Sequence, residues 1–180
     1  IEGLNKVNYL TNESLFDLRK APLHLAIIGG GPIGVEMAQA HARLGVKTTI
    51  IEINTIMQGY ERRVVEPIQK SLINDGVNIL EGTVVDRVEK DNSDIKLHLS
   101  SANALVVSDL LIAAGRVPNI EKLALAEAGI KYNELGVVVD RNLQTTNRSV
   151  YAIGDLVDGP SFTHTASYHA GIVLKKILFG

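Results

Sequence analysis

The chain has 180 residues, a length that suits one domain or slightly more. Hydrophobic residues make up 46% and charged residues 21%, which argues against disorder, collagen-like repeats and low complexity. Lys and Arg together number 18 against 20 Asp and Glu, and this formal net charge of -2 lacks the basic excess expected of a nucleic-acid-binding protein.

The chain has no cysteine, so disulfides, thiolate metal sites and cysteine nucleophiles are excluded within this sequence. Its apolar stretches fall far short of the ~20 residues that span a bilayer. It opens on Ile1 without a signal-peptide pattern. We therefore expect a segment of a longer cytoplasmic protein that binds neither membrane nor nucleic acid.

The first half alternates strand and helix patterns after a polar lead-in. Residues 1–22 predict a lead-in segment with a short helix, capped by Thr11 or Asn12, that ends near Leu18. Then come predicted strands over 23–28, 47–52 and 77–80, separated by predicted helices from Ile33 to Gly45 and from Arg62 to Asn74. This order predicts a Rossmann-like parallel sheet with helices on both faces, in the α/β class.

The second half changes its periodicity. Residues 82–107 alternate with a period near two and predict an antiparallel β-meander. A continuous apolar strand over 110–114 is expected to close the first sheet. The remaining elements expected are a short helix over 123–128, strands over 137–139 and 150–153, and a final helix over 165–178.

A glycine-rich turn gives the strongest single signal for a binding site. Gly29, Gly31 and Gly34 form a G-x-G-x-x-G pattern between the first predicted strand and the first predicted helix. Gly29 allows the tight turn, Gly31 lets the backbone approach a pyrophosphate, and Gly34 permits close packing of helix on strand. The helix N-terminus then offers unpaired N–H groups to the phosphates. The alternative is a tight turn with a structural role only.

Glu52 lies at the end of the next predicted strand. A carboxylate at this place can accept hydrogen bonds from the ribose hydroxyls of an adenine dinucleotide. Because no Lys or Arg occurs between Lys47 and Arg62, the pattern favours NAD over NADP. The alternative for Glu52 is a solvated charge at a strand end.

Other site patterns are missing from the sequence. It contains neither a G-x-x-x-x-G-K-[ST] phosphate loop nor an H-E-x-x-H metal motif. None of the five Tyr residues has a Lys four positions later, as short-chain dehydrogenases require. The five His residues are scattered. We therefore predict no metal site and assign no catalytic residue.

Four stretches together resemble one family. IIGGGPIGVE, TTIIE, LLIAAGRVPN and TTNRSVYAIGD occur in the order typical of the flavin-dependent pyridine nucleotide-disulfide oxidoreductases, which include glutathione reductase, lipoamide dehydrogenase and mercuric reductase. The resemblance covers nearly the whole chain. It implies an NAD(P)-binding domain over 23–114, followed over 115–180 by the C-terminal part of the FAD-binding domain.

The resemblance also implies roles for residues other than the glycines. Glu36 matches an acidic residue near nicotinamide and flavin, Gly115 matches a turn beside the nicotinamide, and Val85 is a weaker match to a contact near adenine. Asp155 matches the aspartate that binds the flavin's ribityl chain. The implied set of NAD and FAD contacts is Gly29, Gly31, Pro32, Ile33, Gly34, Glu36, Glu52, Val85, Gly115, Asp155, Ser161, Phe162, Thr163 and His164.

Several parts of the family pattern do not occur in this sequence. The family's redox Cys pair, its first FAD fingerprint and the Lys partner of Glu36 lie upstream of the matching segment. Its dimerisation domain with a His-x4-Glu base lies downstream. The run Thr165 to Tyr168 differs from lipoamide dehydrogenases and favours members similar to mercuric reductase.

The resulting hypothesis is the central segment of an FAD-dependent NAD(P)H oxidoreductase. Hydride would pass from NADH to FAD and electrons onward to a disulfide or another acceptor, in a parent enzyme expected to be a homodimer. The partners expected for this segment are a nicotinamide cofactor and the rest of the parent enzyme, and alone it is expected to be inactive. Two alternatives stay open: a stand-alone NAD-binding regulatory module without flavin, and a Cys-free flavoenzyme of the ferredoxin-reductase type.

Overall fold

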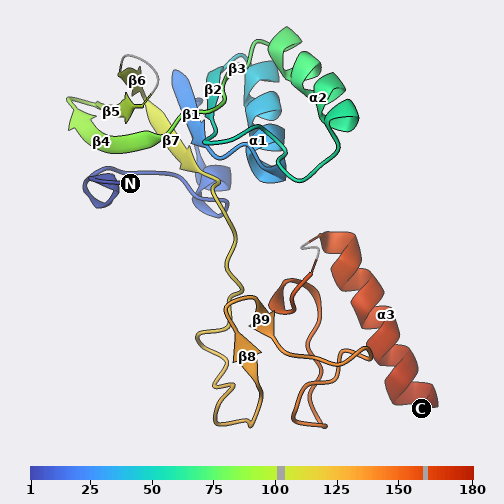
Figure 1. The fold of residues 1–180 in the computed structure, drawn as a ribbon. Helices are drawn as coiled ribbons and strands as arrows, with labels where there is room; N and C mark the ends of the chain where they lie inside the picture. Colours follow the sequence, from blue (N-terminus) through green and yellow to red (C-terminus); the bar gives the residue numbers. More distant parts are fainter. Residues whose placement is uncertain (101–103, 160–161) are drawn as a thin grey trace. The chain divides into compact units, whose positions relative to one another are not determined.

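A computed structural model describes residues 1–100, 104–159 and 162–180. The chain divides into two units, Ile1–Gly115 and Arg116–Gly180 (Figure 1). The first unit contains the glycine-rich turn and Glu52, and the second contains Asp155.

A four-stranded parallel sheet forms the centre of the first unit. Its order is β3-β2-β1-β7, with β1 at His24–Ile28, β2 at Lys47–Ile51, β3 at Asn78–Leu80 and β7 at Asp109–Ile112. Strand β1 pairs in parallel with both β2 and β7. This interior place explains the continuous apolar run, because a central parallel strand is covered on both faces. Leu25, Ala26 and Ile27 are accordingly fully buried.

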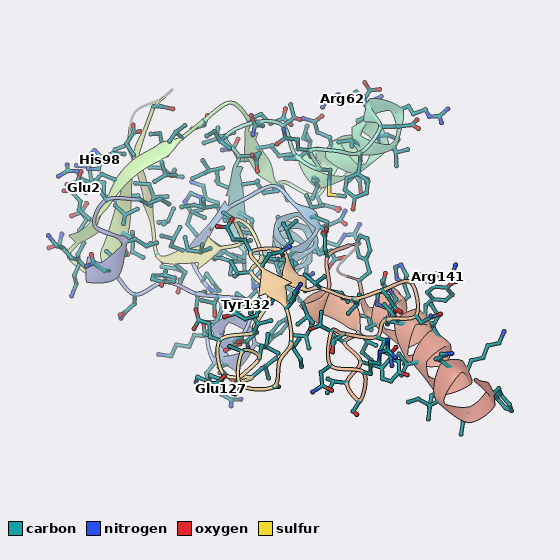
Figure 2. All side chains as sticks on the ribbon, turned by 60° about the horizontal axis from the view of Figure 1, so that its bottom comes forward. Glu2, Arg62, His98, Glu127, Tyr132 and Arg141 are labelled. Carbon is teal, nitrogen blue, oxygen red and sulfur yellow. The ribbon has the colours of Figure 1, made fainter. Side chains whose placement is uncertain are left out.

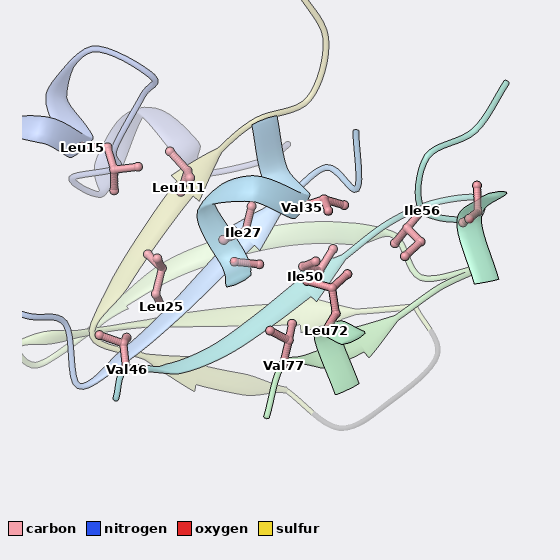
Figure 3. Close-up of a cluster of buried hydrophobic side chains, with 12 residues drawn as sticks. Leu15, Leu25, Ile27, Val35, Val46, Ile50, Ile56, Leu72, Val77 and Leu111 are labelled. Atoms are coloured by element: carbon pink, nitrogen blue, oxygen red, sulfur yellow. The ribbon is translucent and has the colours of Figure 1, made fainter. Parts of the chain in front are cut away.

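Two helices cover one face of this sheet. Helix α1, Pro32–Arg43, begins with proline at its first turn, and α2, Arg62–Asn74, follows β2. Figure 3 shows the side chains between helices and sheet, among them Leu25 and Ile27 from β1, Val35 from α1 and Leu72 from α2. This cluster fixes the start of α1 against the end of β1.

The opposite face carries the antiparallel meander. Strands β4, β5 and β6 occupy Val85–Asp91, Asp94–Leu99 and Leu105–Val107 and pair in that order. Val88 and Leu97 from the meander form a second core with Ala26, Ile51 and Leu110 of the parallel sheet. The α/β class, the Rossmann-like parallel sheet and the meander are therefore confirmed. The expectation of helices on both faces is corrected, because the apolar side of the meander already buries the second face.

Residues 1–22 form short 3-10 helices at Leu4–Lys6 (η1) and Ser14–Asp17 (η2). The expected cap at Thr11 or Asn12 is wrong, because Glu13 is the N-cap of η2 and makes no side-chain cap hydrogen bond. The Oγ1 of Thr11 accepts from the N–H of Ser14 at 3.3 Å in the turn before the helix. Leu10 bridges to Leu111 of β7, and Leu15 is buried in the first core. This segment thus contributes a backbone contact and a side chain to the core of the first unit.

The second unit has less regular structure. It contains a hairpin of β8, Tyr132–Asn133, with β9, Gly136–Val137, a 3-10 turn η3 at Gly154–Leu156, and the long helix α3 at Thr163–Phe179. A small core combines Leu125, Ile130, Val137, Ala152 and Val157. The expected final helix is confirmed, with α3 starting slightly before the predicted residue 165.

Two expected elements of this unit are wrong. Residues 123–128 form turns, because Ala124 adopts a positive φ of 48° that interrupts any helix. Residues 150–153 make only an isolated bridge between Tyr151 and Gln144.

Within the described ranges, no helix is long and apolar enough to cross a membrane.

Candidate dinucleotide-binding site

Gly29 and Gly34 shape the turn from β1 to α1. Gly29 has a φ of 111°, and a Cβ there would lie 2.6 Å from the carbonyl oxygen of Ala113. A Cβ on Gly34 would collide with the carbonyl oxygen of Gly29. Both positions therefore need glycine for reasons internal to the fold, as the spacing predicts.

Gly31 is different, because nothing inside the chain requires glycine there. Its φ of -72° suits any residue, and a Cβ would meet no atom within 4 Å. It is the N-cap of α1 and no side chain caps that end. The first N–H groups of a helix lack partners within the helix. Bare backbone before uncapped N–H groups suits a bound phosphate, and a Cβ would fill that space.

Pro32 and Ile33 form the start of α1 behind this space, and both are partly buried. Glu36 lies one turn further along α1 and is exposed. The helix thus presents a carboxylate on its outer surface close to the glycine-rich turn. Figure 1 shows α1 rising directly from the end of β1.

Glu52 lies beside the same turn. One carboxylate oxygen, Oε2, accepts from the N–H of Gly30 at 2.7 Å, and Oε1 accepts from the N–H of Asn54 at 2.9 Å. Both oxygens are therefore fixed in position, and each keeps a further lone pair for a ligand hydroxyl. The next basic side chain, Arg62, lies at the N-terminal end of α2 with 54% of its side chain exposed (Figure 2).

The residues that follow β7 lie next to the glycine-rich turn. Ala113 donates its N–H to the carbonyl of Ile28 at 2.8 Å, which holds the segment against β1. Gly115 follows with a φ of 84°, a left-handed conformation that favours glycine. The motif that contains Gly115 thus leaves the sheet beside Gly29.

Val85 occupies a different environment from the other expected contacts. Its side chain is 6% exposed and belongs to the second core. It stands at the start of β4, after a segment in which Thr83 donates its N–H to the carbonyl of Glu52 at 3.0 Å. A ligand beside Glu52 could therefore reach the backbone here, while the Val85 side chain packs inward.

The expected flavin contacts lie in the second unit. Asp155 belongs to η3 and forms an ion pair with Arg116. Phe162 immediately precedes α3, Thr163 is its first residue, and the rings of Phe162 and His164 stack with centroids 5.2 Å apart. Ser161 lies outside the described residues.

Sequence reasoning missed three residues that hold these segments. Arg116 pairs with Asp155, and the Nδ1 atom of His169 accepts from the N–H of Gly154 at 3.1 Å. Glu81 accepts from the N–H of Ile56 at 2.8 Å. Arg116 belongs to the quoted GRVPN stretch, so the motif gave a signal. Glu81 and His169 gave none, because their partners are backbone groups that only the fold brings near.

In the described residues no group of three or more metal-ligating side chains comes together.

Comparison with known proteins places the chain in a family. The family described as "Pyridine nucleotide-disulphide oxidoreductase" matches residues 1–170. The chain belongs to this family of FAD- and NAD-binding oxidoreductases.

Individual relatives match most or all of this chain. Mercuric reductase of Bacillus cereus is 36% identical over all of this chain and 29% of its own length. Dihydrolipoyl dehydrogenase of Staphylococcus aureus is 31% identical over 89% of this chain and 36% of its own length. An HOCl-induced flavoprotein disulfide reductase of Escherichia coli superposes with a TM-score of 0.91 and 34% identity over 99% of this chain and 41% of its own. The chain thus spans about a third of the curated relatives.

Proposed function

We propose that this chain is the segment of an FAD-dependent oxidoreductase that binds the nicotinamide dinucleotide and contributes one wall of the flavin site. The observation that carries this proposal is the pairing of the open Gly31 backbone at the start of α1 with the Glu52 carboxylate fixed at Gly30. Family membership supports it. The bound cofactors supply hydride and electron transfer, from NADH to FAD and onward to a disulfide or another acceptor.

The chain's own residues bind and orient in this proposal. Gly31 and the first turn of α1, with Pro32 and Ile33 behind them, hold the pyrophosphate through N–H groups and the helix dipole. Glu52 accepts from the adenosine ribose, with Gly29 and Gly34 fixing the turn. Gly115 passes beside the nicotinamide and Glu36 lies near it, while the backbone at Val85 lies toward the adenine.

The second unit distinguishes this proposal from a regulatory module that binds NAD without flavin. Asp155 is held by Arg116 in an exposed turn next to α3, where a carboxylate could accept from a ribityl hydroxyl. Phe162, Thr163 and His164 form the start of α3, the segment that would run along the flavin with Ser161. A pure NAD sensor has no use for this arrangement, so the flavoenzyme is favoured.

Nucleotide preference tests the proposal. We expect NADH to bind more tightly than NADPH, because Glu52 gains charge-assisted hydrogen bonds from ribose hydroxyls but repels a 2′-phosphate. A difference of ~2–4 kcal/mol corresponds to roughly 30- to 1000-fold. Titration calorimetry of the 180-residue chain with each nucleotide measures it. Equal affinities would contradict the role of Glu52, and lack of NADH binding would contradict the dinucleotide site.

The Glu52→Gln variant sharpens this test. Glutamine keeps a carbonyl oxygen that can accept from Gly30 or Asn54 while removing the negative charge. We expect the variant to bind NADH less tightly and to lose most discrimination against NADPH. Glu66→Gln, on the outer side of α2, is the matched control and should leave both affinities unchanged, since its 55%-exposed side chain lies in a solvent-exposed ion pair with Arg62.

We further propose that the 180-residue chain alone reduces no disulfide or quinone with NADH and retains little FAD. The sequence contains no cysteine, and Asp155 with the start of α3 supplies only one wall of a flavin site. The purified chain should be colourless. A stoichiometric flavin absorption band after gel filtration, or NADH-dependent turnover without a partner chain, would overturn this proposal.

A further inference from the structure

The loop after β2 holds the glycine-rich turn by a second route besides Glu52. Met57 donates its N–H to the carbonyl of Gly30 at 2.7 Å, while the N–H of Gly30 donates to Glu52. Both polar groups of residue 30 are therefore bonded to a single segment, 52–57. The peptide groups on either side of Gly30 cannot turn without breaking one of these two bonds.

Packing strengthens the same contact. Ile56 is 1% exposed, and a Cβ on Gly30 would lie 2.8 Å from its Cγ2 atom. Met57 adopts a φ of 53°, a left-handed conformation that non-glycine residues rarely adopt. Such a conformation persists only where surrounding contacts determine it. The bond from Met57 to Gly30 and the bond from Ile56 to Glu81 are two contacts of this kind.

Glu81 anchors this loop from the other side. Its Oε1 accepts from the N–H of Ile56 at 2.8 Å, and its Oε2 lies 3.4 Å from the amide nitrogen of Gln69 on α2. The neighbouring Gly82 donates its N–H to the carbonyl of Asn54 at 2.9 Å. Glu81 is partly buried, and its carboxylate binds the backbone N–H of Ile56, which lies four residues after Glu52, the nearest expected ligand contact in the sequence.

We infer that Glu81 is a positioning residue for dinucleotide binding: through Ile56 and Met57 it holds the backbone of Gly30, and hence Gly31, in the conformation that receives the pyrophosphate. This inference rests on the proposed function of the glycine-rich turn. It assigns to Glu81 no contact with the ligand. A carboxylate at this position holds the N–H of Ile56 more firmly than an uncharged side chain would, because hydrogen bonds to an ionised group are about twice as strong as neutral ones.

The test compares Glu81→Ala, Glu81→Gln and Glu66→Ala in the 180-residue chain. We expect Glu81→Ala to weaken NADH binding about tenfold in titration calorimetry, the loss that corresponds to one such bond transmitted to the turn. Glu81→Gln, which keeps an acceptor oxygen but forms a weaker neutral hydrogen bond, should recover part of that affinity. Glu66→Ala removes an exposed carboxylate from the adjacent helix and should bind NADH normally.

A readout without ligand separates this inference from the proposed function. In Glu81→Ala, hydrogen exchange of the Gly30 and Met57 amides should accelerate, while amides in the centre of β1 and the thermal midpoint stay close to those of the unmutated chain. Unchanged exchange or unchanged NADH affinity would overturn the inference. If NADH affinity and the thermal midpoint both fall in Glu81→Ala, and Glu81→Gln recovers neither, Glu81 contributes only to stability and the inference is also overturned. If the unmutated chain binds no NADH, the proposed function fails first.

Discussion

The three glycines of the turn between β1 and α1 stand under different constraints. Gly29 and Gly34 are required by backbone conformation or by contact with neighbouring carbonyl groups. Gly31 has an ordinary φ and open space around its Cα. The G-x-G-x-x-G spacing predicted all three positions. The structure gives Gly29 and Gly34 a folding role and shows no such role for Gly31, which we propose binds the pyrophosphate.

A pair of alanine substitutions tests this separation. We expect Gly31→Ala to keep the free energy of unfolding within about 0.5 kcal/mol, since no atom is displaced. Its NADH affinity should fall at least about tenfold, because the added methyl group occupies the space of the pyrophosphate. Gly34→Ala should instead destabilise the fold by about 1–3 kcal/mol through overpacking.

Urea denaturation and NADH titration of both variants provide the measurement. If Gly31→Ala binds NADH as tightly as the unmutated chain, the pyrophosphate is not received at this turn. If Gly34→Ala is as stable as the unmutated chain, α1 can move away from the turn at little cost, and the close packing at that position is not essential.

At the scale of single elements, strand pairing buries a titratable side chain. His24 in β1 is 8% exposed, and its Nε2 atom lies 2.9 Å from Oγ1 of Thr49 in β2. Burial lowers the pKa of His24 below its ordinary value of 6.5, and the nearby Lys47 ammonium lowers it further. The sheet therefore prefers the neutral imidazole.

This preference makes the stability of the first unit depend on pH. Below about pH 6.5 the unfolded chain takes up a proton at His24 that the folded chain resists, so stability falls as pH decreases until the folded pKa is reached. We expect a lower urea midpoint at pH 5.5 than at pH 7.5. In His24→Asn, which cannot titrate, this difference should shrink. An equal difference in both proteins would assign the pH dependence to other groups.

Element boundaries followed the strength of local signals. Helix α2 has the predicted ends, Arg62 and Asn74, because its apolar residues recur regularly and Gly76 follows shortly after. The helix predicted over 123–128 does not form, because Ala124 adopts a positive φ. Leu125 and Ile130 of the same stretch pack into the small core of the second unit. Tertiary packing there outweighs a weak helical propensity.

At the scale of the whole molecule, the two units differ in how much core they contain. The first has two clusters of buried hydrophobic residues on either side of a parallel sheet. Among its described residues the second unit has one cluster of five buried hydrophobic residues, and α3 contributes no buried residue to it. Small cores give little net stability once conformational entropy is subtracted.

We therefore expect a fragment of residues 1–115 to fold alone and to bind NADH within about threefold of the 180-residue chain. A fragment of residues 116–180 should show no cooperative thermal transition, although α3 can keep some helical signal. Circular dichroism melts and NADH titration of both fragments provide the measurement. A first fragment that is unfolded, or folded but unable to bind NADH, would show that the dinucleotide site needs residues beyond 115.

The sequence by itself determined the fold class, the family and the glycine-rich turn with Glu52, because periodicity, turn residues and motif spacing are local properties of the chain. Only the tertiary structure decided that the meander covers the second face of the sheet and that the Val85 side chain packs inward. It also decided that Glu81 and Met57 hold the loop against Gly30. These contacts join residues distant in sequence through backbone N–H and carbonyl groups, which every residue possesses and which therefore leave no trace in side-chain patterns.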